Sequence, residues 1–526
     1  MTTAFDRFCK YNFGKIVLVI SLVVLLSEQA KAEVPIHYSA EAIGYASSYG
    51  EYAPYMMASN RHGTLSQSKG AQLRLSAFNF TDTTKRFSYG FGADFIAGAS
   101  SATHYDYYNP DTDNNSIKRS VRPAHLFIQQ LYGELKYRGF FITLGMKEYN
   151  SVIVNHELSS GDLLYSGNTR PIPEIRVGFI DFQNVPFTNG WVQVQAEYSF
   201  GKNMDNSWLE NHFNYNGGWD DHITTDAFFS YKRFYFRTKP SQPFSLTIGL
   251  QAAMQTGGTV RHYVRGVVTD EYTDKLNFKK MLQTIVPTSS NEYGNYYKQG
   301  NSVGSWDVRG RWLFKNNAEL CAYYQSPFED GSGIGKLNGF DGLYGLEYKS
   351  DKPWYISSAV VEYFDFRNQS GPIHFDSDYN YESGQHRPGN ATGKDDYYNN
   401  YQYSGYQYYG MSLGSPLLRS AFYNLNGSNF FLHNRVYGFH IGLAGFLYRG
   451  LQYRALLSWR TSLGTYDYPL TERQRSLSAL LELQYDIAGV KGLRVKAQFA
   501  GDKGAIYHDN FGALVGLSYS GLFNIK

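Results

Sequence analysis

The fold is decided by the decapeptide SLSALLELQY, residues 476–485, in which apolar and polar side chains alternate. Leu477 and Leu481 occupy odd positions, whereas Ser478 and Glu482 occupy even ones. Successive side chains of a β-strand point to opposite faces of the sheet, so these positions belong to different faces. The stretch therefore predicts a strand with one apolar and one polar face.

The same alternation recurs in distant parts of the chain. It is present in LRVKAQF (493–499), VQVQAEY (192–198) and residues 434–448, and again in 511–519 near the C-terminus. Phe523 then lies three residues before the end, whereas barrel proteins usually end on an aromatic residue. After residue 32 no stretch approaches the roughly 18 consecutive apolar residues of a transmembrane helix. Strands, not helices, are expected throughout.

The connections between these strands distinguish a barrel from a two-sheet sandwich, whose strands also bury one face. Short turns alternate with long polar connections, as in outer-membrane barrels with tight periplasmic turns and long external loops. The predicted short turns are Thr83–Lys85, Arg138-Gly139, Pro186–Asn189, Lys239–Gln242, Lys315–Asn317, Asp351–Pro353, Arg449-Gly450 and Gly489–Gly492. The predicted long connections are 48–70, 99–122, 149–171, 201–223, 256–302, 327–340, 367–433, 462–474 and 501–508. The spacing predicts an all-β, antiparallel transmembrane β-barrel of about eighteen strands, with both termini on the periplasmic side.

The N-terminus is typical of a secretory signal peptide. Basic residues precede the apolar stretch 16–26, and Ala30-Lys31-Ala32 supplies a small-x-small cleavage pattern. We therefore predict a cleaved signal over 1–32 and a barrel over 33–526, located in the outer membrane of a Gram-negative cell. Because Cys9 belongs to the signal, Cys321 is the single cysteine of the mature chain and cannot form an intramolecular disulfide.

Composition agrees with a membrane barrel and excludes some other functions. Aromatic residues make up 17% of the 526 residues, with 47 Tyr and 36 Phe, although the mean hydropathy is −0.42. Aromatic girdles and Tyr-rich loops account for that combination. The net charge is +3 and no tract of Lys and Arg is present, which argues against nucleic acid as a partner.

A barrel of this size encloses a channel unless something fills it. Phe278, Met281, Leu282 and Ile285 form an apolar stripe at helical spacing, which fits either a helix inside the barrel or a surface helix on an outer loop. The connection 149–171 is a second candidate for folding inward. We predict an occluded lumen.

Two stretches resemble the capsule-assembly Wzi family. Residues 159–173, SSGDLLYSGNTRPIP, resemble the family's N-x-R-P-[IL]-P signature through Asn168, Arg170, Pro171 and Pro173. Residues 397–417 resemble its later Tyr- and Gly-rich motif, and the long Tyr-rich loops resemble members from Bacteroidota. The resemblance implies an occluded outer-membrane barrel of about eighteen strands that acts as a lectin for capsular polysaccharide.

The Tyr-rich loop supplies the candidate glycan-binding residues. Tyrosine offers a flat apolar face for sugar C–H groups and a hydroxyl for hydrogen bonds, although such rings can equally pack the loop against itself or lie at the membrane interface. The predicted binding residues are Tyr397, Tyr398, Tyr401, Tyr403, Tyr406, Tyr408, Tyr409 and Arg419. The expected partners are surface or capsular polysaccharide together with outer-membrane lipid and lipopolysaccharide, bound by a monomer.

Several alternatives remain at this point. Arg170 either grips a carboxylate of the glycan or pairs with an acid in the lumen, with Pro171 and Pro173 stiffening the start of a strand. Lumen charges such as Glu482 and Lys496 are compatible with a porin for small polar solutes. No catalytic motif is complete, and the acidic runs near 111–115 and 376–382 lack a full calcium loop, so we predict no enzyme activity, cofactor or metal.

Overall fold

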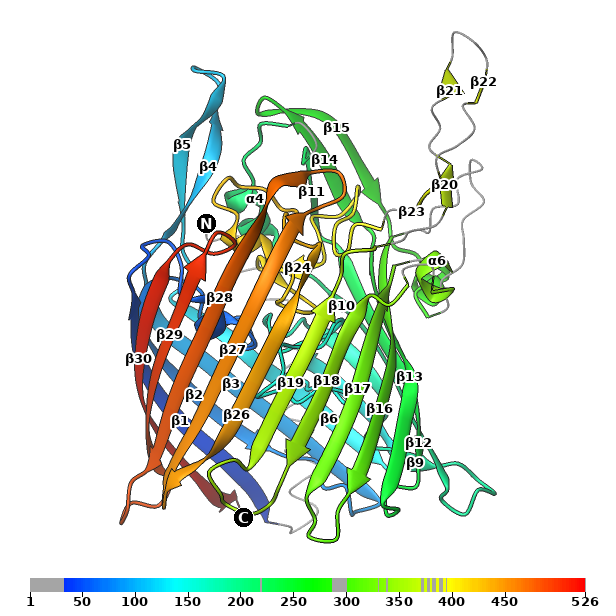
Figure 1. Cartoon of the computed structure of the whole chain (residues 1–526), viewed down its shortest axis with the longest axis vertical. Helices are drawn as coiled ribbons and strands as arrows, with labels where there is room; N and C mark the ends of the chain where they lie inside the picture. The colour runs from blue at the N-terminus through cyan, green and yellow to red at the C-terminus, as the bar shows by residue number, and fades with distance from the viewer. Residues whose placement is uncertain are drawn as a thin grey trace.

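The computed structural model describes residues 33–525 apart from 218–219, 286–299, 330, 337–338, 370–372, 376–378, 381–384, 387–390 and 394. Its main feature is a closed wall of antiparallel strands with long connections at one end and short turns at the other (Figure 1). The predicted signal peptide, residues 1–32, lies outside the described residues. Within the described residues, none of the helices has the length and hydropathy that a membrane crossing needs.

The wall contains eighteen strands, which confirms the predicted all-β barrel. The strands are β1 (Val34–Ser47), β2 (Lys69–Asn79), β3 (Phe87–Ser100), β6 (Leu126–Tyr137), β7 (Phe140–Met146), β8 (Glu174–Phe179), β10 (Val192–Lys202), β12 (Phe228–Thr238), β13 (Phe244–Thr256), β16 (Asn301–Leu313), β17 (Glu319–Phe328), β18 (Gly342–Lys349), β19 (Ser358–Asp365), β26 (Val436–Tyr448), β27 (Leu451–Gly464), β28 (Pro469–Asp486), β29 (Leu493–Gly504) and β30 (Asn510–Ile525). A short segment, β9 (Gln183–Asn184), continues β8 along β10. The barrel closes where β1 pairs with β30, from Val34 opposite Ile525 to Ser47 opposite Gly512. Closure leaves no free sheet edge, as a bilayer requires.

The alternation in the sequence separates the outer and inner faces of the wall. Along β28, Leu477 and Leu481 are 45% and 42% exposed on the outer face, whereas Ser478 and Glu482 are buried inside. Exposed aromatic side chains collect beside the short turns, where a membrane interface is expected. They include Phe80, Phe87, Tyr137, Phe140, Trp191, Phe244, Trp312, Trp354, Tyr448 and Phe523.

All eight predicted short turns join neighbouring wall strands, and the other connections leave the opposite end. The predicted long connection 462–474 is wrong in its bounds, because β27 extends to Gly464 and β28 begins at Pro469, so that only a short turn separates them. The long connections carry small elements of their own. These are α3 (Tyr55–Ala58), β4 (Thr103–Asn109), β5 (Asn114–Val121), α4 (Asn206–His212), β11 (His222–Thr225), β14 (Gly258–Val264), β15 (Val267–Asp274), α5 (Phe278–Gln283), α6 (Gly331–Ile334), β20 (Ile373–Phe375), β21 (Tyr379–Asn380), β22 (Gln385–His386), β23 (Ala391–Gly393), β24 (Gln407–Tyr408), β25 (Met411–Ser412) and the 3-10 turn η3 (Ala421–Tyr423).

Three connections fold into the barrel, and we call residues 48–68, 147–173 and 395–435 the inner segments. The second runs across the inner face of the wall: Ser160 N donates to Glu362 of β19 at 2.8 Å, and Gln251 of β13 donates to Asp162 at 2.9 Å. The first is anchored by Tyr55, whose N–H donates to Asp502 of β29 at 2.7 Å. Their apolar side chains form a buried core inside the wall.

The apolar stripe predicted at helical spacing, which begins at Phe278, lies outside the barrel, on the opposite side of the wall from the inner segments. α5 has no buried residue, and its neighbour Thr284 places its hydroxyl 2.7 Å from the Tyr198 hydroxyl. Tyr198 belongs to the outward-facing set of β10, whereas Glu197 faces the interior. Of the two alternatives, the surface helix is therefore the one that the structure adopts.

Candidate functional site

The two stretches that resemble family motifs meet inside the barrel. Asn168 Nδ2 donates to Ser412 Oγ at 2.9 Å, and Asn168 Oδ1 accepts from the backbone N–H of Asn60 at 3.2 Å. The hydroxyls of Tyr398 and Tyr406 donate to the carbonyls of residues 163 and 164. Asn168 therefore joins all three inner segments. This gives the Asn of the N-x-R-P-[IL]-P-like motif a structural role.

Burial divides the predicted glycan-binding residues into two groups. Tyr397, Tyr398, Tyr403, Tyr406 and Tyr408 are 0–3% exposed, so their rings form the packing of the inner segments. This reduces the set of predicted binding residues, because a ring enclosed on both sides has no face free for a sugar. Of these five, Tyr408 alone lines the cleft described below.

The remaining predicted residues keep some exposure but occupy different places. Tyr401 is 63% exposed and Tyr409 is half-buried. Arg419 is half-buried and donates to the carbonyl of Tyr423. Pro171 and Pro173 lead directly into β8, where they fix the backbone at the start of the strand.

Arg170 is held between two aromatic rings. Its guanidinium carbon lies 3.8 Å from the centroid of the Phe127 ring and 4.7 Å from that of Tyr409. Burial lowers the pKa of this guanidinium. Within the described part of the chain no ion pair joins Arg170 to a carboxylate, so of the two alternatives the pairing with a lumen acid is not the one that the structure adopts. Stacking on rings replaces it and leaves the N–H groups without an opposite charge.

Arg170 lines a cleft at one mouth of the barrel. The cleft encloses about 480 Å³ at the end of the barrel that carries the long connections. This volume is within the range of ligand sites, roughly 300–1,000 Å³. Of the predicted residues, Arg170, Tyr408 and Tyr409 line it. Four residues that the sequence did not indicate also line the cleft: Phe127, Trp208, Asn211 and Arg122.

Trp208 is the largest ring that the sequence alone did not indicate. It lies on α4 and stacks on His212 at 4.4 Å and 17°. Burial lowers the pKa of His212 to about 4, so that ring is neutral at neutral pH. Gly410, with a φ of +78°, lets the chain pass against Trp208, since a Cβ there would lie 2.2 Å from the indole. The sequence held no signal for this contact, because about 200 residues separate the two positions.

A smaller cavity of about 140 Å³ adjoins the cleft through Thr64, Gln72 and Ile96. The charged side chains that line it form ion pairs. Lys496 Nζ lies 2.5 Å from Glu41, and Arg74 lies 3.1 Å from Glu148. The lumen charges noted in the sequence are thus engaged in ion pairs across the wall and with the inner segments.

The chain forms a β-barrel of the outer-membrane type, with a closed wall and an apolar outer face. A cleft lined by aromatic rings lies at one mouth of this barrel. Among solved structures, the chain is similar to Wzi of Escherichia coli, described as an outer membrane protein involved in group 1 capsule assembly and a carbohydrate binding β-barrel. The identity is 13% and the TM-score 0.52, over 97% of this chain and 88% of that one.

OccAB2 of Acinetobacter baumannii matches with 11% identity and a TM-score of 0.44, over 94% of this chain and 98% of that one. OpdK of Pseudomonas aeruginosa matches with 9% identity and a TM-score of 0.38, over 93% and 99%. No protein-family model and no curated protein sequence matches the chain. The similarity to the Escherichia coli barrel, with its TM-score of 0.52, shows the barrel fold.

Proposed function

We propose that the protein is an outer-membrane, lectin-like protein that binds surface polysaccharide through the cleft around Arg170. The observation that carries the proposal is a cation, stacked on rings and lacking an acid partner among the described residues, in a cleft that the half-buried indole of Trp208 also lines. Aromatic faces bind the C–H surface of a sugar, and a guanidinium binds carboxylates and hydroxyls in a planar fork. Tyr409 contributes both to the stack and to the lining.

This proposal includes membership of the Wzi family, an exported chain with a cleaved signal, and attachment or assembly of capsule or exopolysaccharide at the surface of a Gram-negative cell. It also includes a monomeric state and a binding role without catalysis. The carbohydrate binding described for the Escherichia coli barrel supports it by analogy of fold alone.

The second candidate function is a channel for small polar solutes. The adjoining cavities of about 480 and 140 Å³, the smaller one lined by charges, favour it. Against it, the inner segments bond to the wall from β13 to β29. Single-channel conductance in planar bilayers separates the two functions, because a binding barrel filled by its own segments passes little current.

The test of the proposed function is deletion of the gene, followed by measurement of cell-bound and released polysaccharide. Attachment predicts a shift from bound to released polymer with total synthesis preserved. Loss of all polymer indicates a role in synthesis or export, and an unchanged distribution contradicts the proposal. The control is complementation with the Trp354→Ala variant, because Trp354 is an exposed residue beside a short turn, at the end of the barrel opposite the cleft.

A further inference from the structure

Two histidines lie opposite each other in the sheet formed by β11, β14 and β15. His222 and His262 are paired in the register of β11 and β14, and their ring centroids are 5.3 Å apart. Directly opposed residues in an antiparallel pair project from the same face, so both rings lie on one side of this sheet. Asp221 immediately precedes β11, where the chain is not yet constrained to strand geometry.

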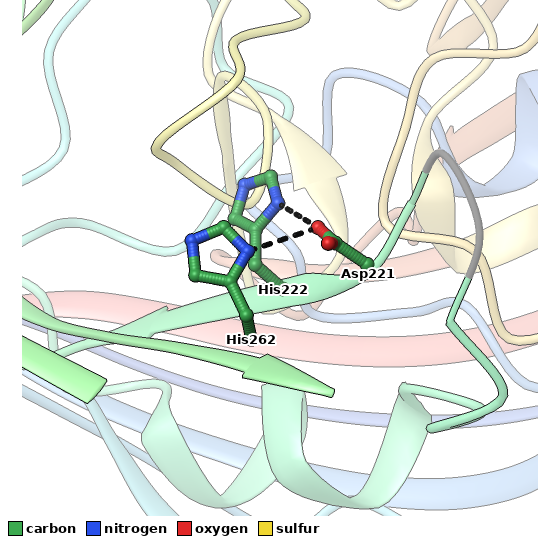
Figure 2. A group of neighbouring side chains, drawn as sticks. All are labelled: Asp221, His222 and His262. Carbon is green, nitrogen blue, oxygen red and sulfur yellow. Dashed lines mark hydrogen bonds and ion pairs between the residues drawn. The ribbon is translucent and has the colours of Figure 1, made fainter. Parts of the chain in front are cut away.

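The three side chains converge on one point (Figure 2). Nδ1 of His222 lies 3.2 Å from Asp221 Oδ1, and Nδ1 of His262 lies 3.1 Å from the same oxygen. All three ligand atoms lie within 4.8 Å of one another. In a tetrahedral zinc site with bonds of 2.0–2.1 Å, neighbouring ligand atoms are about 3.3 Å apart. The two distances to Asp221 Oδ1, 3.2 and 3.1 Å, are therefore close to the spacing of a metal site, and the two histidine nitrogens lie within 4.8 Å of each other.

The surroundings fix these groups in place. The carbonyl of Asp221 accepts from Tyr263 N at 2.7 Å, beside a bulge at His262 and Tyr263 in the pairing of β14 with β15. Phe430 of the third inner segment contacts the His222 ring edge-on at 6.0 Å. Nε2 of His222 has no hydrogen-bond partner among the described residues, so the ring is oriented from its Nδ1 side.

One side of the group is open to solvent. The side chain of His222 is 2% exposed, whereas those of His262 and Asp221 are 26% and 31% exposed. A cation can enter from that side and keep water as a further ligand. Two imidazole nitrogens with one carboxylate suit a transition metal, while Mg²⁺ and Ca²⁺ prefer oxygen ligands throughout.

We propose that Asp221, His222 and His262 bind one divalent transition-metal ion, with Zn²⁺ as the best match. The prediction of no metal is thereby revised for this position. The site lies next to the contact between β11 and the inner segment 395–435, where Thr224 N donates to Ser404 Oγ at 2.9 Å. A bound ion joins β11 to β14 and so holds the loop sheet on that segment. This inference is independent of the polysaccharide proposal.

The test is Zn²⁺ titration of the folded chain in detergent, after chelator treatment, in competition with a chromophoric chelator. We expect one equivalent of bound Zn²⁺, and at least about tenfold weaker binding in His262→Asn and in Asp221→Asn. His104→Asn is the matched control, because Nδ1 of His104 lies 3.0 Å from Glu51 in a pair that has no second histidine. We expect His104→Asn to bind Zn²⁺ with the same affinity as the unmodified chain.

X-ray absorption of the zinc-loaded protein is expected to show two imidazole ligands, reduced to one in His262→Asn. Heat-modifiable migration on gels verifies that each variant retains a folded barrel. The proposal is overturned if the unmodified chain binds no equivalent of Zn²⁺, or if His262→Asn binds it as tightly as His104→Asn does.

Discussion

The guanidinium of Arg170 lies 4.7 Å from the ring centroid of Tyr409, which joins two sequence motifs that are more than 200 residues apart. Tyr409 in turn donates its backbone N–H to Asp205 at 3.0 Å, the residue that precedes α4 and Trp208. One chain of contacts therefore sets the positions of the cation and the indole that line the cleft.

Removing the indole is expected to weaken polysaccharide binding. Trp208→Ala eliminates the broadest aromatic face of the cleft, and we expect about tenfold lower affinity, equivalent to about 1.4 kcal/mol. The measurement is equilibrium binding to polysaccharide purified from the source strain. Trp354→Ala removes an indole that is 65% exposed beside a short turn and should bind normally. Equal affinities for the two variants would contradict the assignment of Trp208.

Replacing Arg170 is expected to weaken the binding of acidic polysaccharide more than the binding of neutral polysaccharide. Arg170→Gln loses the cation, whereas Arg170→Lys keeps the charge but loses the planar fork and part of the ring stacking. We expect both variants to bind an acidic polysaccharide more weakly, with Gln the weaker, and the salt dependence of binding to decrease in Gln. Comparable losses on neutral and acidic polymers would show that the charge has no role in recognition.

Asn168 is expected to contribute to stability within the barrel. Asn168→Ala removes the amide that donates to Ser412 Oγ and leaves the N–H of Asn60 without its acceptor, at a cost of about 1–3 kcal/mol. Hydrogen exchange should accelerate in 159–169 and 407–415 while the wall strands stay protected. The exposed Asn211, changed to Ala, serves as the control. Unchanged exchange in both stretches would refute the structural role.

Gly410 is expected to be required for the position of Trp208. In Gly410→Ala the new methyl group would lie 2.2 Å from the indole, so the ring must move. Gly489→Ala is a matched control, because Gly489 also has a positive φ, +87°, but a Cβ there meets nothing within 4 Å. Tryptophan fluorescence should shift, and polysaccharide binding should weaken, in the first variant alone. A normal spectrum in Gly410→Ala would mean that the contact is not maintained in solution.

Replacing inner segment residues 149–169 by a short Gly-Ser link is expected to raise conductance. These residues cross the lumen and bond to several wall strands. The control shortens the hairpin of β4 and β5, which projects away from the barrel mouth (Figure 1). Large current through the unmodified protein would favour the channel function instead.

The wall was predictable from sequence because its cause is local. Leu477 and Leu481 face lipid, whereas Ser478 and Glu482 face the polar interior, so the alternation along the strand reflects its two environments. The spacing of the turns then gives the number of strands. The cleft was not predictable, since Phe127, Trp208 and Tyr409 come from three separate parts of the chain: the start of β6, α4 and the inner segment 395–435. Buried Tyr406 and exposed Tyr401 are equivalent in sequence, and their difference depends on the partners that the fold supplies.

Whether the cleft binds polysaccharide is measured by equilibrium binding of the purified barrel to polysaccharide from its own strain, compared with an Arg170→Gln/Trp208→Ala double variant. We predict saturable binding by the original chain and loss of that binding in the double variant, with both proteins folded by heat-modifiable migration. Absence of saturable binding by the original chain, or equal binding by the folded double variant, would contradict a polysaccharide site in this cleft.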